Sequence, residues 1–267
     1  MTTTTVSTSL RRTTGGLLVL GALAFAVAAT VLSSTFDWPD ILREPAGVVL
    51  SAFAAGGTSL VWTWFAVAWT YAILAVPILL LPTVLGRRDD SALRAVTYLG
   101  ATSVVLSLIG FLRWVFVVPP LADAHAAGDA TTRAAVEAAF TAQHQYGGAL
   151  LGEHLGQLLV IGWSVTLSVI ILRSLVLPRW LGVTGLGASA LYLLNQGEVL
   201  ATAVPDFPVW EPAGFLGSTA WGLWVAALGV TVLLRPADAP IPLGGAAEVP
   251  ASSASLPRQA APLGAPR

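Results

Sequence analysis

Residues 147–177, GGALLGEHLGQLLVIGWSVTLSVIILRSLVL, decide the fold class of this chain. A run of about 20 mostly apolar residues is long enough to cross a bilayer as a helix. This run does not alternate apolar with polar residues, as a half-buried strand would. It also contains a carboxylate, Glu153, in a region where ionisable groups are costly and usually functional. The stretch therefore predicts a membrane-spanning helix that carries a candidate site residue.

Six apolar runs of this kind predict an all-α, polytopic membrane helix bundle with six transmembrane helices. The runs cover residues 16–34, 59–86, 95–121, 147–177, 180–204 and 215–234. The second and fourth exceed the length that a bilayer requires, so we expect them to tilt or to extend beyond it. The membrane domain is thus predicted over residues 16–235, with residues 1–15 and 236–267 as disordered cytoplasmic tails.

The composition excludes most soluble functions. Of 267 residues, 55% are hydrophobic and 10% charged, whereas a soluble domain carries about 25% charged residues. The 13 basic and 14 acidic residues provide no basic surface, so nucleic acid is excluded as a partner. The absence of Cys excludes disulfides and thiolate chemistry. Membrane lipids are the partners that we expect.

The arginines predict the orientation, because cytoplasmic loops carry an excess of positive charge. Near helix ends, one side holds Arg11, Arg12, Arg87, Arg88, Arg94, Arg173, Arg179 and Arg235. The other side holds only Arg43 and Arg133, together with eight acidic residues: Asp37, Asp40, Glu44, Asp123, Asp129, Glu137, Asp206 and Glu211. Both termini are therefore predicted to be cytoplasmic. The first run also resembles a signal peptide; we expect it to be retained, and its cleavage would leave five helices in the same orientation.

Two connections on the outer side are predicted to contain one or two interfacial helices. Residues 37–57 are half apolar, which favours a helix that lies in the interface. Residues 122–145 contain a helical stretch from Thr131 to Phe140. We interpret this stretch either as a lid helix across the outer surface or as a solvated connector.

Few ionisable residues lie inside the predicted spans, and Arg113 and Glu153 are the two that lie at one depth. Arg113 is six residues before Pro119, and Glu153 is about six residues after Gly147. At 1.5 Å per residue, both lie roughly 9 Å below the outer boundary. Because their helices are antiparallel neighbours, we expect an Arg113–Glu153 ion pair. This pair could act as a structural clamp or as part of a ligand or catalytic site, and the sequence leaves both open.

Other polar residues share this depth. Tyr146, Glu153, Gln157 and Ser164 follow helical spacing on one face, and Gly152 with Gly156 forms a small-residue surface for close packing. The next span adds Tyr192, Asn195 and Gln196. The candidate ligand-binding residues are Tyr146, Gln157, Tyr192, Asn195, Gln196, Trp69 and Trp114.

Tryptophans need a separate interpretation, because an aromatic belt at the membrane interface explains many of them. The belt accounts for Trp38, Trp62, Trp64, Trp210 and Trp221. Trp69 and Trp114 lie deeper or next to Arg113, so the sequence leaves two interpretations open for them, the same belt or the wall of an aromatic cavity.

Four segments resemble a bacterial multi-pass family, the domain of unknown function 4386. They are RWVFVVP at 113–119, HQYGG at 144–148, GEHLG at 152–156 and LPRWLG at 177–182. The resemblance extends over about residues 16–234 and implies a compact six-helix bundle in the bacterial plasma membrane. It implies no reaction.

Three functions remain open. The first is a non-enzymatic protein that binds an apolar or amphipathic ligand, such as an isoprenoid, in an outer-leaflet pocket, or that acts as a sensor or partner subunit. The second is a membrane enzyme acting on a lipid-like or isoprenoid substrate, with Glu153 as general acid or base and with Arg113 and His154 as further catalytic residues. The third is a small-molecule transporter. The three histidines lack metal-ligand spacing, so neither a metal nor a cofactor is predicted.

Overall fold

Every regular element in the computed structural model is a helix, over the described residues 7–174 and 176–235. The predicted all-α membrane bundle is thereby confirmed. In chain order the elements are α1 (Thr8–Phe36), η1 (Asp40–Arg43), α2 (Ala46–Ala72), α3 (Ala75–Val84), α4 (Ser91–Phe116), α5 (Val118–Ala127), α6 (Ala130–Gln143), η2 (His144–Leu155), α7 (Gly156–Ser174), α8 (Arg179–Leu194), α9 (Gln196–Ala201) and α10 (Ala213–Leu234). The start of α1 lies within the predicted tail 1–15, whereas the predicted tail 236–267 lies outside the described residues.

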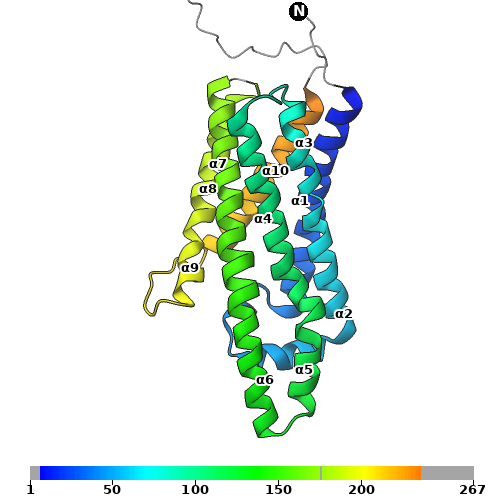
Figure 1. Ribbon diagram of the computed structural model, residues 1–267, viewed down its shortest axis with the longest axis vertical. Helices are drawn as coiled ribbons and strands as arrows, with labels where there is room; N and C mark the ends of the chain where they lie inside the picture. Colours follow the sequence, from blue (N-terminus) through cyan, green and yellow to red (C-terminus); the bar gives the residue numbers. More distant parts are fainter. Residues whose placement is uncertain (1–6, 175, 236–267) are drawn as a thin grey trace, which may run out of the picture.

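The long helices run side by side along one axis (Figure 1). α1 begins and α10 ends at one end of the bundle, which we call the terminal end. α5 and α6 project from the opposite end, which we call the hairpin end.

Five helical stretches among the described residues are long and apolar enough to cross a membrane: Thr8–Phe36, Ala46–Val84, Ser91–Ala127, Ala130–Ser174 and Ala213–Leu234. The span predicted at residues 180–204 is divided at Asn195 into α8, with 16 residues, and α9, with 6 residues. α8 packs against α7 and α10, but it is shorter than the roughly 20 residues that a bilayer core requires. Six transmembrane helices therefore remain a prediction, with five such stretches found among the described residues.

Proline and glycine account for the breaks in the long helices. Proline lacks an N–H, and its ring clashes with the carbonyl four residues earlier. α2 accordingly gives way to α3 around Ile73, four residues before Pro77. α4 ends at Phe116, four residues before Pro120. Gly57 kinks α2 with φ 56° and ψ −152°, a conformation that residues with side chains rarely adopt.

The helical stretch predicted at residues 131–140 belongs to α6, but it forms no lid across the bundle. α6 continues through η2 into α7, so that Ala130–Ser174 is one rod of 45 residues. α6 therefore projects from the hairpin end beside α5 (Figure 1). The lid interpretation is wrong because the chain contains no proline between α6 and α7, and the glycines there are accommodated within the rod.

The connection at residues 37–57 contains η1 and the part of α2 before its kink. This part of α2 packs against α5 and α6, and Gly47 lies beside Glu137 and His125. His125 Nε2 is 2.9 Å from Glu137 Oε1, which joins α5 to α6. The hairpin end is thus a small helical unit rather than a set of irregular loops.

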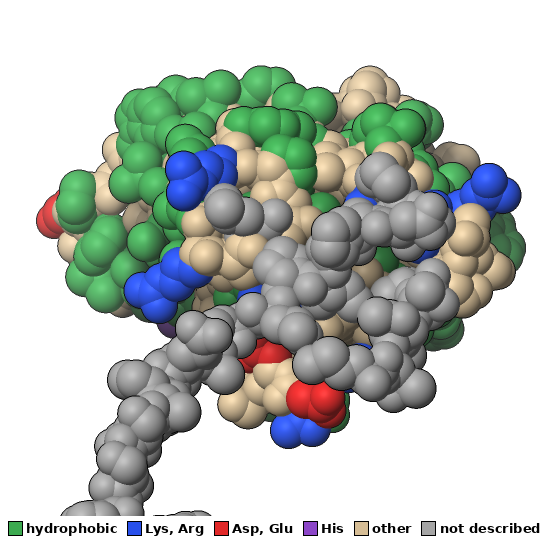
Figure 2. Space-filling view, turned by 90° about the horizontal axis from the view of Figure 1, so that it is seen from above, with side chains coloured by type: hydrophobic (Ala, Val, Ile, Leu, Met, Phe, Trp, Pro, Cys, Tyr) green, Lys and Arg blue, Asp and Glu red, His purple; other side chains and the backbone are tan. Residues whose placement is uncertain are grey.

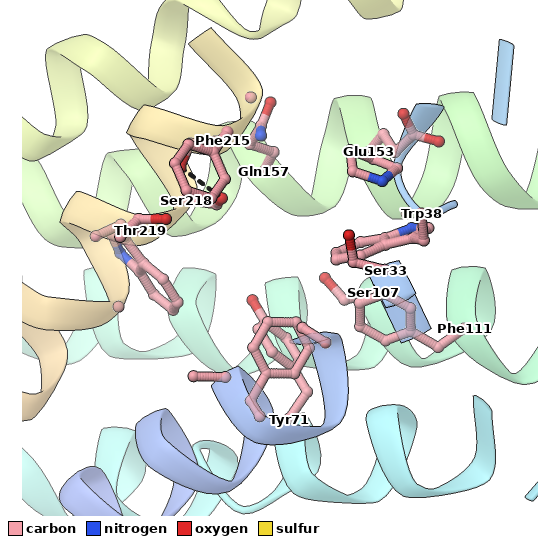
Figure 3. A pocket seen from close by; sticks show the side chains of 18 of the residues that line it. Ser33, Trp38, Tyr71, Ser107, Phe111, Glu153, Gln157, Phe215, Ser218 and Thr219 are labelled. Atoms are coloured by element: carbon pink, nitrogen blue, oxygen red, sulfur yellow. Dashed lines mark hydrogen bonds between the residues drawn. The ribbon is translucent and has the colours of Figure 1, made fainter. Parts of the chain in front are cut away.

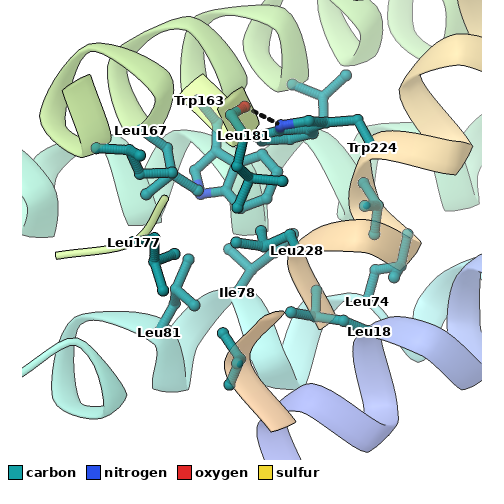
Figure 4. Close-up of a cluster of buried hydrophobic side chains, with 14 of the residues drawn as sticks. Leu18, Leu74, Ile78, Leu81, Trp163, Leu167, Leu177, Leu181, Trp224 and Leu228 are labelled. Atoms are coloured by element: carbon teal, nitrogen blue, oxygen red, sulfur yellow. Dashed lines mark hydrogen bonds between the residues drawn. The ribbon is translucent and has the colours of Figure 1, made fainter. Parts of the chain in front are cut away.

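Two clusters of buried side chains hold the bundle together. The larger cluster lies nearer the terminal end and includes Leu18, Ile78, Leu167 and Leu228 (Figure 4). The smaller cluster lies nearer the hairpin end and is rich in aromatic side chains, with Phe36, Phe53, Trp64, Trp114 and Phe140. The candidate site lies beside this second cluster.

Candidate ligand-binding cavity

A cavity of about 720 Å³ lies in the half of the bundle nearer the hairpin end. Its lining comes from both ends of the chain, including α1, η1, α4, η2 and α10. In Figure 3, Glu153 and Gln157 extend from one helical rod; Trp38 is drawn next to Glu153, Phe215 next to Gln157, and Phe111 farther from Glu153 than Trp38. Small-molecule sites commonly occupy about 300–1,000 Å³, so the cavity has the size of a ligand site.

The residues that belong both to the cavity lining and to the outer surface indicate a sideways opening between α1 and α10. These two helices cross closely near the terminal end, where a Cβ on Gly15 would lie 2.7 Å from the carbonyl oxygen of Gly229. Nearer the hairpin end both helices line the cavity, and several lining residues are also on the outer surface. They include Leu23 of α1, and Phe215 and Leu223 of α10, the last two 70% and 67% exposed. The helix faces that bound this opening would be in contact with lipid in a membrane.

Trp64 and Trp114 form an aromatic wall of the cavity. Their rings stack 4.8 Å apart at an interplanar angle of 5°, and Trp38 meets Trp64 edge-on at 6.4 Å. Trp64, Trp114 and Trp221 are all buried cavity-lining residues. The belt interpretation is therefore wrong for Trp64 and Trp221, because packing inside the bundle places their rings away from its surface.

Arg43 joins three elements through two carboxylates. Its Nη2 lies 2.5 Å from Glu153 Oε2, and its Nε lies 2.9 Å from Glu198 Oε1. The contacts tie η1 to η2 and α9. Burial alone would lower the pKa of Arg43, but the two carboxylates, Glu153 first, outweigh it and raise this pKa above its usual value. We call Arg43, Glu153 and Glu198 the charge clamp.

Arg113 does not pair with Glu153, which corrects the predicted ion pair. Its side chain is only 8% exposed; Nη1 donates to the carbonyl of Gly110, and Nη2 lies 3.5 Å from His144 Nδ1. Within the described parts of the chain, no carboxylate oxygen lies within 4.0 Å of its guanidinium. The prediction is wrong because Arg43, from a connection outside the predicted spans, reaches Glu153.

An amide network continues the polar side of the cavity. Gln196 Nε2 donates to Gln157 Oε1 and, at 3.3 Å, to the backbone carbonyl of Glu153. His154 Nδ1 lies 2.6 Å from Gln196 Oε1, and Asn195 Nδ2 lies 3.5 Å from Gln157 Oε1. The network holds η2 and α7 against α8 and α9.

The segment that carries Glu153 is a π-helix of 12 residues, η2. π-helical turns are rare and often occur at functional sites. Glycines let α4 approach this segment closely: a Cβ on Gly152 would lie 3.1 Å from the Cα of Gly110, and one on Gly156 would lie 3.0 Å from Ser107 Oγ. The predicted packing surface of Gly152 and Gly156 is therefore confirmed.

The structure brings most of the predicted site residues together. Arg113, Glu153, Gln157, Tyr192, Asn195 and Trp114 line the cavity. Gln196 and His154 are hydrogen-bonded beside this lining, whereas Tyr146 and Trp69 lie on the surface, 61% and 51% exposed. The sequence assigned no site role to other lining residues: Trp38, Arg43, Trp64, Tyr71, Ser107, Phe111 and Glu198.

A comparison with family models matches residues 13–229 to the family described as "Domain of unknown function (DUF4386)". The chain belongs to the DUF4386 family. The resemblance inferred from the four short segments is thus confirmed. Comparisons of this DUF4386 protein with curated proteins and with solved structures give no match.

Proposed function

We propose that this protein is a plasma-membrane protein that binds an amphipathic, lipid-like ligand in the cavity. The observation that carries the proposal is a single cavity that has a polar side, an aromatic wall and a lateral opening. An apolar chain would lie between α1 and α10 against Phe111 and Trp64. The polar part of the ligand would then reach Gln157 and the charge clamp.

The arginine distribution supports a location in the outer leaflet. The arginines predicted to be cytoplasmic belong to elements that begin or end at the terminal end, and blue side chains stand at several places around this face (Figure 2). The positive-inside rule then assigns both termini to the cytoplasm. The cavity, nearer the hairpin end, would lie in the outer half of the membrane.

The charge clamp supports binding rather than catalysis. A general acid must carry a proton that it can release to substrate, whereas the Glu153 carboxylate is in contact with the guanidinium of Arg43. Such a contact favours the ionised carboxylate. Positioning of a polar group therefore suits Glu153 better than general-acid catalysis.

Mass spectrometry of co-purified lipids tests the proposal, with Gly222 as the position to vary. Gly222 lines the cavity, and a Cβ built there meets no atom within 4 Å. Gly222→Trp would thus place a large side chain into open space without a backbone clash. We expect wild type to retain a lipid-like compound that Gly222→Trp loses.

Gly187→Trp is the matched control. Gly187 is also a mid-helix glycine with no atom within 4 Å of a Cβ, but it is exposed and does not line the cavity. It should retain the same compound as wild type. Equal retention by all three proteins, or no compound in wild type after purification in mild detergent, would contradict the proposal.

A further inference from the structure

The charges around the cavity indicate which class of ligand it accepts. Building on the proposed function, we propose that the ligand is an anionic amphiphile, with a phosphate or carboxylate head group that binds Arg113, and that it enters sideways from the bilayer between α1 and α10. The cavity contains two arginines and two glutamates. These four groups are not equivalent.

Arg43 and the two glutamates are already engaged with one another. Glu153 and Glu198 contact the same guanidinium at 2.5 Å and 2.9 Å. A cationic ligand would have to compete with Arg43 for either carboxylate. An anionic ligand would likewise have to displace a carboxylate to reach Arg43. The charge clamp therefore leaves Arg113 as the lining arginine that has no carboxylate of the described residues in contact with its guanidinium.

Arg113 has donors to spare. A guanidinium carries five N–H donors, while within residues 7–174 and 176–235 Arg113 makes one hydrogen bond, to Gly110, and one long contact, to His144. The guanidinium also makes a cation–π contact with Trp114, with Cζ 5.1 Å from the ring centroid. A buried cation in a membrane is expensive without an anion. Arginine also binds carboxylate and phosphate through two parallel hydrogen bonds, so an oxyanion supplies the missing partner.

The lining explains why this oxyanion should belong to an amphiphile. η1 contributes Leu42 and Arg43 to the lining from the hairpin end, and Gly15 with Gly229 brings α1 and α10 together near the terminal end. Between these limits, the rim consists of surface residues that also line the cavity. On α10 they are Phe215, Thr219 and Leu223, spaced four residues apart on one helix face, and on α1 they include Leu23, Ala26 and Thr30.

A rim of this composition passes apolar chains better than hydrated ions. The lipid tails would stay between α1 and α10 while the head group reaches Arg113. A free phosphate ion would have to cross this apolar rim, which is unfavourable for a charged group. The lateral opening and Arg113 together therefore predict selection by head-group charge among molecules already dissolved in the membrane.

Native mass spectrometry of the purified full-length chain tests the head-group class. The probes are phosphatidylglycerol, phosphatidylcholine, oleate, a dioleoyl trimethylammonium lipid and inorganic phosphate. We expect phosphatidylglycerol and oleate to be retained about tenfold better than the trimethylammonium lipid, since charge-assisted hydrogen bonds to a buried guanidinium are strong. Phosphatidylcholine, which carries a phosphate together with a cation, should lie between them. Arg113→Met should remove this preference. Arg133→Met, at an exposed arginine of α6 outside the cavity lining, should keep it.

Arg113→Lys is a second variant that keeps the inference testable if Arg113→Met does not fold. It keeps the charge but loses the bidentate geometry, so we expect a preference between those of wild type and Arg113→Met. Preference for the trimethylammonium lipid, equal retention of all lipids, or phosphate binding as tight as lipid binding would each overturn the inference. If these lipids are lost from Gly222→Trp but not from Arg113→Met, the anionic class fails while the proposed function stands. Retention by Gly222→Trp would instead refute the proposed function.

The absence of native cysteine allows a clean test of lateral entry. Thr219→Cys places one thiol on the rim, and Val230→Cys places one on the exposed face of α10 away from the cavity. Each is labelled with a bulky maleimide in nanodiscs, and uptake of fluorescent phosphatidylglycerol is followed. We expect at least a severalfold slower uptake for the adduct at 219 only. Equal rates for both adducts would overturn entry between α1 and α10.

Discussion

The partner of Glu153 can be identified by a double-mutant cycle, because two arginines lie near it. In Arg43→Met, Glu153 and Glu198 lose their shared guanidinium, while the side chains remain only about a quarter exposed, 23% and 26%. Removing one partner of a fully buried ion pair costs about 3–5 kcal/mol. Partial solvent screening reduces this figure, so we expect a loss of about 2–3 kcal/mol in the free energy of unfolding.

Thermal unfolding in nanodiscs measures this loss. For a chain of this length, 1 kcal/mol corresponds to about 2–4 °C in Tm, which predicts a decrease of about 4–12 °C for Arg43→Met. Glu153→Gln removes the same contact from the other side. The two substitutions together should therefore destabilise less than the sum of the single effects, with a coupling energy of about 1–3 kcal/mol.

Arg113→Met provides the contrast within the same cycle. Because no carboxylate oxygen in the described part of the chain lies within 4.0 Å of Arg113, its coupling to Glu153→Gln should be smaller than that of Arg43. A coupling that is larger for Arg113 than for Arg43, or an unchanged Tm in Arg43→Met, would refute the assignment of the charge clamp.

Three further substitutions test the packing around the site by the same unfolding assay. Gly148→Val should destabilise the protein by at least about 1–3 kcal/mol, because a Cβ there would lie 2.6 Å from Cζ of Arg113; an unchanged Tm would show that Arg113 does not lie over Gly148. Trp64→Ala should cost about 3–5 kcal/mol through the loss of its stacked, buried ring, and a loss below about 1 kcal/mol would place this ring outside the packed wall. Asp90→Ala should cost about 1 kcal/mol, because Asp90 accepts from the Leu93 N–H at the start of α4. This bond holds the pKa of Asp90 below its usual value. Its contribution to the free energy of unfolding is therefore present above about pH 4 and is lost as the pH falls through the folded-state pKa. A difference in Tm between wild type and Asp90→Ala that does not shrink in acid would argue against the cap.

The length of the apolar runs predicted the helical fold class, whereas the breaks next to Pro77 and Pro120 were not predicted. Run length alone predicted helices that cross the bilayer, and five such stretches appear in the structure. What the runs could not predict was the division of residues 180–204. Asn195 separates α8 from α9, and neither a proline nor a glycine at that position marks the break.

The site was predictable where polar residues lie within apolar runs. Glu153 and Gln157 stand out against their neighbours, because a polar group is costly in lipid, and both line the cavity. Arg43 offered a weaker signal. It lies in a connection where charge is ordinary, and only its isolation among eight acidic residues set it apart. Its reach back to Glu153 depends on the path of η1, which local sequence does not determine.

The aromatic residues show why depth along a helix is insufficient to predict a wall. Trp64 and Trp69 are five residues apart on α2, so they point in different directions. Trp64 is buried against Trp114, whereas Trp69 is half exposed. Which of them faces the interior depends on the rotation of α2 against α4. The hydrophobic pattern leaves that rotation undetermined because α2 is apolar on most of its circumference.

The same cluster can serve both stability and binding because its two arginines are held differently. Arg43 satisfies both glutamates and ties η1, η2 and α9 together, so its loss should affect stability first. Arg113 lies beside it with unused donors, so its loss should affect binding first. A purely structural cluster would give the two arginines similar effects on Tm and no effect on lipid retention. We therefore expect Arg43→Met to have the larger effect on Tm and Arg113→Met to have the larger effect on lipid retention. This result would distinguish a binding site from a purely structural cluster.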